Sequence, residues 1–150
     1  MIYLISYKNK RKITSLKMLR YRFFDELTRL FTRGKYTHSE IAIDLGNGLF
    51  ECYTASVQDK GVRKKVMKLD KEKWDFIQLN ISPKRVRHYF KKTDALKYDF
   101  LGAVGVALPI RENRNKLFCS EFCYNCIFKS NEGWRFSPNQ LFEIVKSKNL

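Results

Sequence analysis

The feature that most constrains the fold is a hairpin pattern between His38 and Tyr53. From His38 to Leu45 apolar and polar residues alternate, and a second apolar stretch follows at Leu49–Tyr53. Alternation with a period of two is typical of a strand with one covered face. The connecting residues, Gly46-Asn47-Gly48, tolerate positive φ and favour a tight turn. The sequence therefore predicts two antiparallel strands that belong to the core of the fold.

Strands and helices are predicted on both sides of this hairpin. Residues 2–7 form a short buried strand, and 15–32 an amphipathic helix with Gly34 as its stop signal. Its apolar stripe is Leu16, Leu19, Phe23, Leu27, Leu30 and Phe31. Further strands are expected at 62–69, as an edge or exposed strand, and at 74–79. Further helices are expected at 83–92, 98–108, from Cys119 onward, and at 139–146, with Ser137 as the cap of the last.

This order of elements indicates the fold class. A strand, a helix, a meander of strands and then several helices are typical of an α+β protein. We expect an antiparallel sheet of about five strands packed by helices, in a single domain over residues 1–150. The hydrophobic content of 44% is that of a packed globule rather than a disordered chain.

The charge of the chain points to an anionic partner. Thirty Lys and Arg against fifteen Asp and Glu give a net charge of +15. The basic clusters are residues 8–12, 63–68 and 84–92. Such an excess favours association with a wall polymer, an anionic lipid surface or nucleic acid, although a solvated basic face without a dedicated ligand explains it equally well. Charge indicates the kind of surface a protein meets and says nothing of a reaction.

No targeting segment is recognisable in the sequence. No apolar run approaches the roughly 20 residues that cross a bilayer. The apolar start, Ile2–Tyr7, is too short for a signal-peptide core and has no basic region before it. We therefore expect no signal peptide, no transmembrane segment and a cytoplasmic protein.

A cysteine stands at the predicted start of an apolar helix, in the stretch Leu117–Cys126. The unpaired N–H groups and the positive end of a helix dipole favour thiolate over thiol at Cys119. The thiolate is the nucleophilic form, so the position suits covalent catalysis. The competing interpretation is that Cys119 is a small buried hydrophobic residue, the commoner fate of a free cysteine.

The spacing of Cys119, Cys123 and Cys126 also fits a metal-ligand pattern, C-x3-C-x2-C. An iron–sulfur cluster with this spacing needs a loop wrapped around it, whereas a helix places these residues along one face. A zinc site is disfavoured because neither histidine, His38 or His88, is in paired spacing with the cysteines. We therefore expect no metal and no cofactor, with Cys123 and Cys126 in the core stripe of the helix.

A catalytic cysteine needs a base, and His38 is the better candidate. It stands at a strand start after a loop, where an imidazole can face a cleft, whereas His88 lies among basic residues and reads as a surface residue. A third group must fix the imidazole tautomer. Glu40, Asp44 and Glu51 are candidates, and Glu51 is favoured because its neighbours are apolar. Glu40 stays open because it shares a face with His38.

Six motifs in order carry a family resemblance. They are Tyr-Thr-His38-Ser-Glu-Ile-Ala-Ile, Leu-Phe-Glu51-Cys, Gly61-Val62, Lys-Tyr98-Asp99-Phe-Leu-Gly, Phe-Cys119-Ser-Glu-Phe-Cys and Phe-Ser-Pro138-Asn-Gln-Leu. Together they resemble the circularly permuted papain-fold amidases of the NlpC-type superfamily, in the YiiX/YaeF-like branch. Small proteins of this type also occur in phages and other viruses. For a phage-encoded chain the expected location is the cytoplasm of the host.

The resemblance implies a fold and a set of roles. It implies a circularly permuted papain-like domain with the nucleophile at a helix N-terminus. Cys119 matches the nucleophile, His38 the general base and Glu51 the residue that orients the histidine. Tyr98 resembles a tyrosine near the cleft that helps to bind or polarise the substrate carbonyl. The backbone N–H of Cys119 would serve as an oxyanion donor.

These roles define three functional hypotheses. The first is a cysteine hydrolase that cleaves an amide or isopeptide bond in a peptide, peptidoglycan or protein conjugate through an acyl-enzyme. The second is a lipid acyltransferase or thioesterase with the same Cys–His dyad. The third is a non-catalytic basic module that binds a host protein or nucleic acid.

Overall fold

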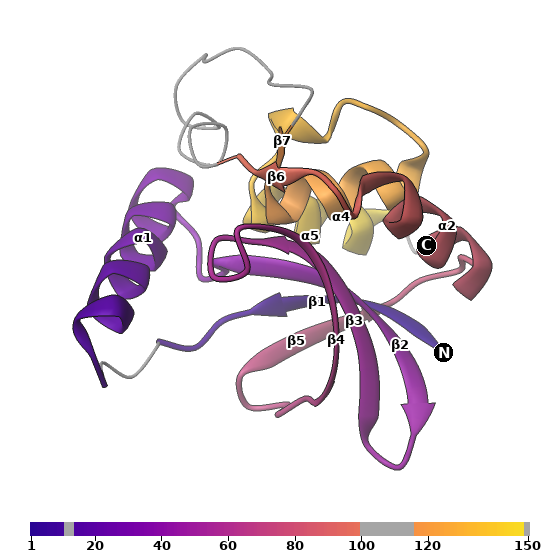
Figure 1. Ribbon diagram of the computed structural model, residues 1–150, viewed down its shortest axis with the longest axis horizontal. Coiled ribbons are helices and arrows are strands. Elements are labelled where there is room, and N and C mark those ends of the chain that lie inside the picture. Colours follow the sequence, from indigo (N-terminus) through magenta and orange to yellow (C-terminus); the bar gives the residue numbers. More distant parts are fainter. Residues whose placement is uncertain (11–13, 100–115, 149–150) are drawn as a thin grey trace.

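The computed structural model describes residues 1–10, 14–99 and 116–148, and we use its element labels throughout (Figure 1). The strands are β1 (Ile2–Tyr7), β2 (His38–Gly46), β3 (Leu49–Ser56), β4 (Gly61–Lys68), β5 (Trp74–Gln78), β6 (Lys97–Tyr98) and β7 (Lys116–Leu117). The helices are α1 (Leu16–Thr32), α2 (Pro83–Thr93), α4 (Cys119–Phe128) and α5 (Pro138–Ser147), with a 3-10 turn at Gly133–Arg135.

One curled sheet organises the described residues. Its strand order is β5-β1-β2-β3-β4-β6-β7. Neighbouring strands are antiparallel, except that β6 and β7 run parallel. The α+β class is confirmed, but the prediction of a purely antiparallel sheet of about five strands is wrong. The two additional strands have only two residues each, too few to give an alternating pattern.

The predicted hairpin is present as β2 and β3. Asn47 and Gly48 both have positive φ, as a tight turn of this kind requires. Gly46, also at positive φ, lies at a shift in register, so that Asp44 pairs with Phe50 while Gly46 pairs with Leu49. This β-bulge determines which β3 side chains share a face with those of β2.

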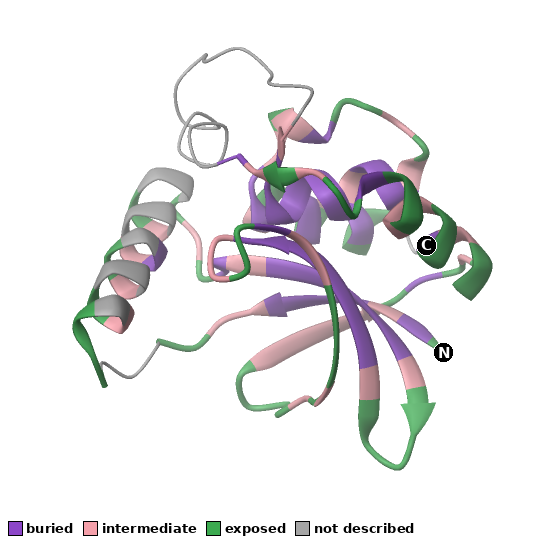
Figure 2. Ribbon diagram, in the orientation of Figure 1, coloured by how far each residue is buried: buried purple, intermediate pink, exposed green. Residues whose placement is uncertain are grey.

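The strands in the middle of the sheet are buried over much of their length (Figure 2). The two faces of the sheet bury different apolar groups. One face carries Ile41, Ile43 and Tyr53, which pack with residues of α2, α4 and α5 in the main core. The other carries a smaller cluster built on Ile5, Ala42 and Cys52. Its edges are the aromatic side chains of Tyr3, Phe50, Trp74 and Phe76. The chain thus covers the face of the sheet opposite to its helices mainly with its own aromatic rings.

Helix α1 begins where the sequence predicts, but its end has a different cause. Ser15 accepts a hydrogen bond from the Met18 N–H as the N-cap. At the other end Arg33, rather than Gly34, adopts the left-handed conformation. The glycine is needed for close approach, since a Cβ on Gly34 would overlap the side chain of Asn139. Asn139 itself binds the backbone N–H and C=O of Tyr36.

Both segments that flank α1 are tied to one carboxylate on β5. Asp75 accepts hydrogen bonds from Lys8 Nζ at 2.7 Å, from Lys35 Nζ at 2.8 Å and from the Tyr36 hydroxyl at 2.7 Å. Burial would raise the pKa of Asp75, but these three donors lower it well below its usual range. The start and the end of the α1 segment are therefore held at the same place on the sheet.

The helix predicted at 98–108 lies almost wholly outside the described residues. At its start the prediction is wrong, because Tyr98 belongs to β6 and pairs with Leu117 of β7. The Asp99 N–H then donates to the Leu117 carbonyl. This pairing places Tyr98 on the strand beside the residues that lead into α4.

Candidate active site

The cysteine predicted as nucleophile is the first residue of α4. Phe118 before it is extended, and its carbonyl accepts the Phe122 N–H at 2.9 Å as the first bond of the helix. The Ser120 hydroxyl donates to the Phe136 carbonyl at 2.8 Å and so fixes the first turn. The first N–H groups of a helix have no intrahelical acceptor. Cys119 therefore lies beside the first backbone N–H groups of α4, at the positive end of the helix dipole.

His38 is the first residue of β2, and its imidazole is held among other side chains. Only 14% of the side chain is exposed. The ring meets Trp74 edge-on, with 6.4 Å between the ring centroids, and Trp74 is in turn packed against Tyr7. The strand start itself is fixed by the Thr37 N–H, which donates to the Tyr7 carbonyl. The imidazole thus has an orientation set by packing.

The structure brings His38 together with Cys119 and Glu40. His38 Nε2 lies 3.0 Å from Glu40 Oε1. Burial would lower the pKa of His38, but the charge of Cys119, the hydrogen bond with Cys119, and the carboxylate of Glu40 together raise it to about 9. The imidazole is accordingly protonated at neutral pH and lies between the Cys119 sulfur and the Glu40 carboxylate. Since Nε2 is engaged by Glu40, the ring nitrogen left for the sulfur is Nδ1.

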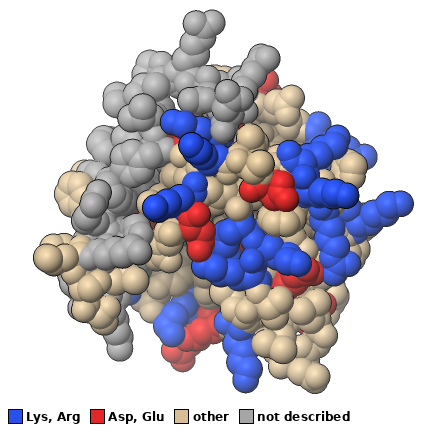
Figure 3. Space-filling model, in the orientation of Figure 1, with Lys and Arg blue, Asp and Glu red and all other residues tan. Residues whose placement is uncertain are grey.

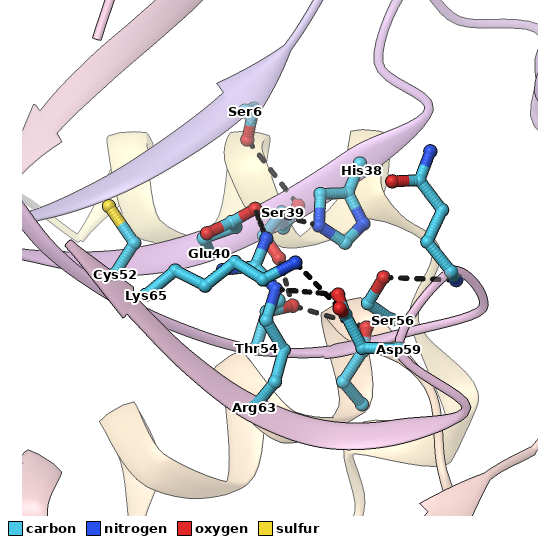
Figure 4. A network of polar contacts seen from close by, with 12 residues as sticks. Ser6, His38, Ser39, Glu40, Cys52, Thr54, Ser56, Asp59, Arg63 and Lys65 are labelled. Carbon is cyan, nitrogen blue, oxygen red and sulfur yellow. Dashed lines mark hydrogen bonds and ion pairs between the residues drawn. The ribbon is translucent and has the colours of Figure 1, made fainter. Parts of the chain in front are cut away.

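Glu40 belongs to a buried ionic network that continues along β4 (Figure 4). Its side chain is 1% exposed, and Oε1 also accepts Arg63 Nη2 at 2.6 Å. Arg63 Nε lies 3.1 Å from Asp59, whose other oxygen binds Lys65. A buried carboxylate needs such compensation to stay charged. Arg63 therefore supports the anion that faces His38.

Glu51 does not take part in this arrangement, and its predicted role as the orienting acid is corrected. It pairs across the hairpin with Ile43 and so points from the face opposite to that of Glu40. Its carboxylate binds Arg87 Nη2 at 2.7 Å and lies 3.5 Å from Lys64 Nζ. Partial burial would raise the pKa of Glu51, but the hydrogen bond from Arg87 lowers it. Glu40, the alternative from the same strand as His38, occupies the predicted position.

The other cysteines lie in apolar surroundings. Cys123 and Cys126 are packed in the main core with Phe122 and Ile127, as the helical spacing predicts, and Cys52 lies in the smaller cluster. Burial raises the pKa of Cys126 and of Cys52 to about 12 in each case, and that of Cys123 well above its usual range. These three thiols are therefore held in the protonated, unreactive form.

Two further residues singled out in the sequence are placed by the fold. His88 is exposed on α2, as predicted. Tyr98 packs against the main core from β6, on the strand adjacent to Leu117. Its participation in substrate binding stays a prediction.

Arg63 and Trp74 are the site residues that sequence reasoning missed. Arg63 looked like one of several basic residues on an exposed strand, yet only 13% of its side chain is exposed. A possible signal was its place between Val62 and Val66, where a long arginine side chain on one face of a strand can reach an acid across the sheet. Trp74 was predicted only as the start of a strand, and nothing in its neighbourhood pointed to His38.

Basic side chains gather on the side of β4 and α2 (Figure 3). Several of them are interspersed with acidic partners, including Lys64 and Arg87 with Glu51, and Lys65 with Asp59. Within residues 1–10, 14–99 and 116–148, His, Cys, Asp and Glu side chains form no group of three or more that could hold a metal ion. In the same part of the chain no helix is both long and apolar enough to span a bilayer.

Comparisons with known proteins add no assignment. The sequence matches no protein-family model, and neither the curated proteins nor the solved structures contain a match.

Proposed function

We propose that this protein is a cysteine hydrolase that cleaves an amide or isopeptide bond. The observation that carries the proposal is the position of the His38 imidazole between Cys119 at a helix start and the buried carboxylate of Glu40. Cys119 and Glu40 together raise the pKa of His38 to about 9 against the effect of burial. A protonated imidazole beside a sulfur at a helix N-terminus is the arrangement that favours a thiolate. The six motifs that resemble the permuted papain-like, NlpC-type amidases support the same assignment.

The geometry suggests how the reaction would proceed. The Cys119 thiolate attacks the carbonyl carbon, and backbone N–H groups at the start of α4 stabilise the oxyanion. The His38 imidazolium then gives its proton to the departing amine as the C–N bond breaks, leaving a thioester on Cys119. Neutral His38 next takes a proton from water, which attacks the thioester and releases the acid and the thiolate. Glu40 holds the ring and stabilises its charged form throughout.

Selective alkylation tests the nucleophile without knowledge of the substrate. We expect iodoacetamide to modify Cys119 of the folded protein near neutral pH, and Cys52, Cys123 and Cys126 only after unfolding. The sites are identified by mass spectrometry, and His38→Ala should slow the reaction of Cys119. The proposal fails if Cys119 reacts no faster than Cys123 in the native protein.

Amide and ester substrates separate the two catalytic hypotheses. A thiol amidase should release amines from peptide or isopeptide conjugates, with Cys119→Ala inactive. Turnover of acyl thioesters or lipid esters alone would assign the same dyad to an acyltransferase or thioesterase. A biological effect that survives Cys119→Ala intact would favour the non-catalytic binding module.

A further inference from the structure

Four apolar side chains of helix α1 are exposed, while polar side chains of the same helix contact the rest of the molecule. Leu16, Leu19, Phe23 and Leu30 are 83%, 47%, 59% and 70% exposed. With 3.6 residues per turn they fall within an arc of roughly 60°. These four side chains share one face of the helix, and we call them the α1 stripe. Four large apolar side chains on one helix face are more than the scattered exposed residues of an ordinary surface.

Polar residues anchor α1 to the protein. Asp25 is buried, and Arg29, 14% exposed, donates to the backbone carbonyls of Lys8, Asn9 and Lys35. Both residues lie roughly 100° or more around the helix from the middle of the α1 stripe. The usual arrangement of a surface helix is the reverse, with the apolar stripe on the core. An apolar stripe that points outward, on a helix held by polar contacts, is available to bind something outside the molecule.

The charge around the stripe indicates the occupant. Residues 8–35 contain ten Lys and Arg against two acidic residues, and the whole chain carries +15. Lys10 and Arg33, which flank α1, are exposed. A second copy of the chain would bring the same positive charge against this surface, and nucleic acid offers a charged backbone rather than an apolar layer. An anionic bilayer surface supplies both an apolar interior boundary and negative headgroups.

We propose that α1 is an interfacial helix that seats the protein on an anionic lipid surface. The α1 stripe enters the boundary between headgroups and acyl chains, and the basic residues that flank the helix contact the headgroups. The helix lies in the plane of the surface, which is consistent with the finding that no described helix is long and apolar enough to span a bilayer. This inference does not depend on the hydrolase assignment, because it uses no residue of the Cys119 site.

Vesicle co-sedimentation of the full chain tests the proposal. At low salt the protein should bind vesicles of phosphatidylcholine mixed with phosphatidylserine and leave vesicles of phosphatidylcholine alone largely unbound. Binding should weaken as salt is added, because screening shortens the reach of the headgroup charge. Replacing Lys10 and Arg33 by Gln should weaken it roughly fivefold for each charge removed. Failure to bind either kind of vesicle would overturn the proposal.

Two matched double variants locate the contact. Leu16→Gln with Leu30→Gln should reduce vesicle affinity at least about tenfold, because two buried apolar side chains are lost from the interface. Leu45→Gln with Val66→Gln removes two exposed apolar side chains from the hairpin and β4 and should leave the affinity unchanged. Equal binding by both variants and the wild type would overturn the assignment to α1.

Self-association is the remaining outcome. Light scattering at rising protein concentration should detect no dimer that is disrupted in the double variant Leu16→Gln with Leu30→Gln. Such a dimer would assign the α1 stripe to a second copy and overturn the proposal. Vesicle binding that occurs only when an acidic protein contaminant is present would overturn it as well. Retention of Cys119 alkylation in the α1 variants would show that the fold and the candidate site are intact, so the two proposals fail separately.

Discussion

His38 Nε2 lies 3.0 Å from Glu40 Oε1, and the two residues are two positions apart on the same strand. Residues at that spacing share a face of the sheet, so the pair is built by the pleat alone. Arg63 of β4, which is separated from β2 by β3, lies 2.6 Å from the same oxygen of Glu40. The proposed acid–base group is thus a local feature of β2 that a residue of β4, two strands away in the sheet, stabilises.

Replacing Glu40 and Glu51 by Gln in separate variants should distinguish the roles of the two acids. Glu40→Gln removes the negative charge beside His38 and should slow iodoacetamide alkylation of Cys119 at neutral pH by about tenfold, the effect of one pKa unit in the imidazole–thiol equilibrium. Glu51→Gln is the matched control, since its carboxylate binds Arg87 on the opposite face. Equal rates for the two variants would contradict the corrected assignment.

The titration of His38 should occur at alkaline pH. Because the pKa of His38 is raised to about 9, its proton contributes stability that is complete below the ordinary imidazole value of 6.5 and is lost as pH rises through about 9. In His88→Gln, which has a single histidine, the imidazole C–H proton resonance should shift with a midpoint near 9. Adding Cys119→Ala should move that midpoint down. A midpoint at or below 6.5 would be incompatible with the ion pair.

Loss of Arg63 should destabilise the protein more than loss of an exposed lysine. Arg63→Gln leaves the buried Glu40 carboxylate without its closest cation and should lower the free energy of unfolding by about 3 kcal/mol. Lys65, half-exposed beside Asp59, is the control, and Lys65→Gln should cost about 1 kcal/mol or less. Urea denaturation measures both, and similar midpoints for the two variants would count against a buried network.

Asp75 should make the free energy of unfolding depend on pH in the acidic range. Its lowered pKa means that its contribution is present above the ordinary value of 3.8 and is lost as pH falls below it towards the folded-state pKa. Asp75→Asn should lower the free energy of unfolding at pH 7 by about 1–2 kcal/mol. The difference from wild type should shrink as the pH falls well below 3.8. Asp70→Asn, which removes an exposed carboxylate, should have a smaller effect at both pH values.

The strongest local patterns predicted their elements correctly. The alternation after His38, the turn at Gly46–Gly48, the start of α1 next to Ser15 and the cap at Ser137 appear where the sequence places them. So does the helix that begins at Cys119. Each depends on interactions between residues only a few positions apart, and such interactions are written directly in the sequence.

Register and long-range charge were decided only by the tertiary structure. The bulge at Asp44–Gly46 places Glu51 opposite Ile43, and a shift of one residue would have moved its side chain to the face of His38. The short parallel strands β6 and β7 have no sequence pattern of their own and pair only because the chain returns to the sheet edge. The sequence by itself determined the helix-start cysteine, the strand-start histidine and their order. That Glu51 lies on the opposite face, and that Arg63 is the cation that stabilises Glu40, depended on how separate strands align, because a pairing register is a property of two segments together.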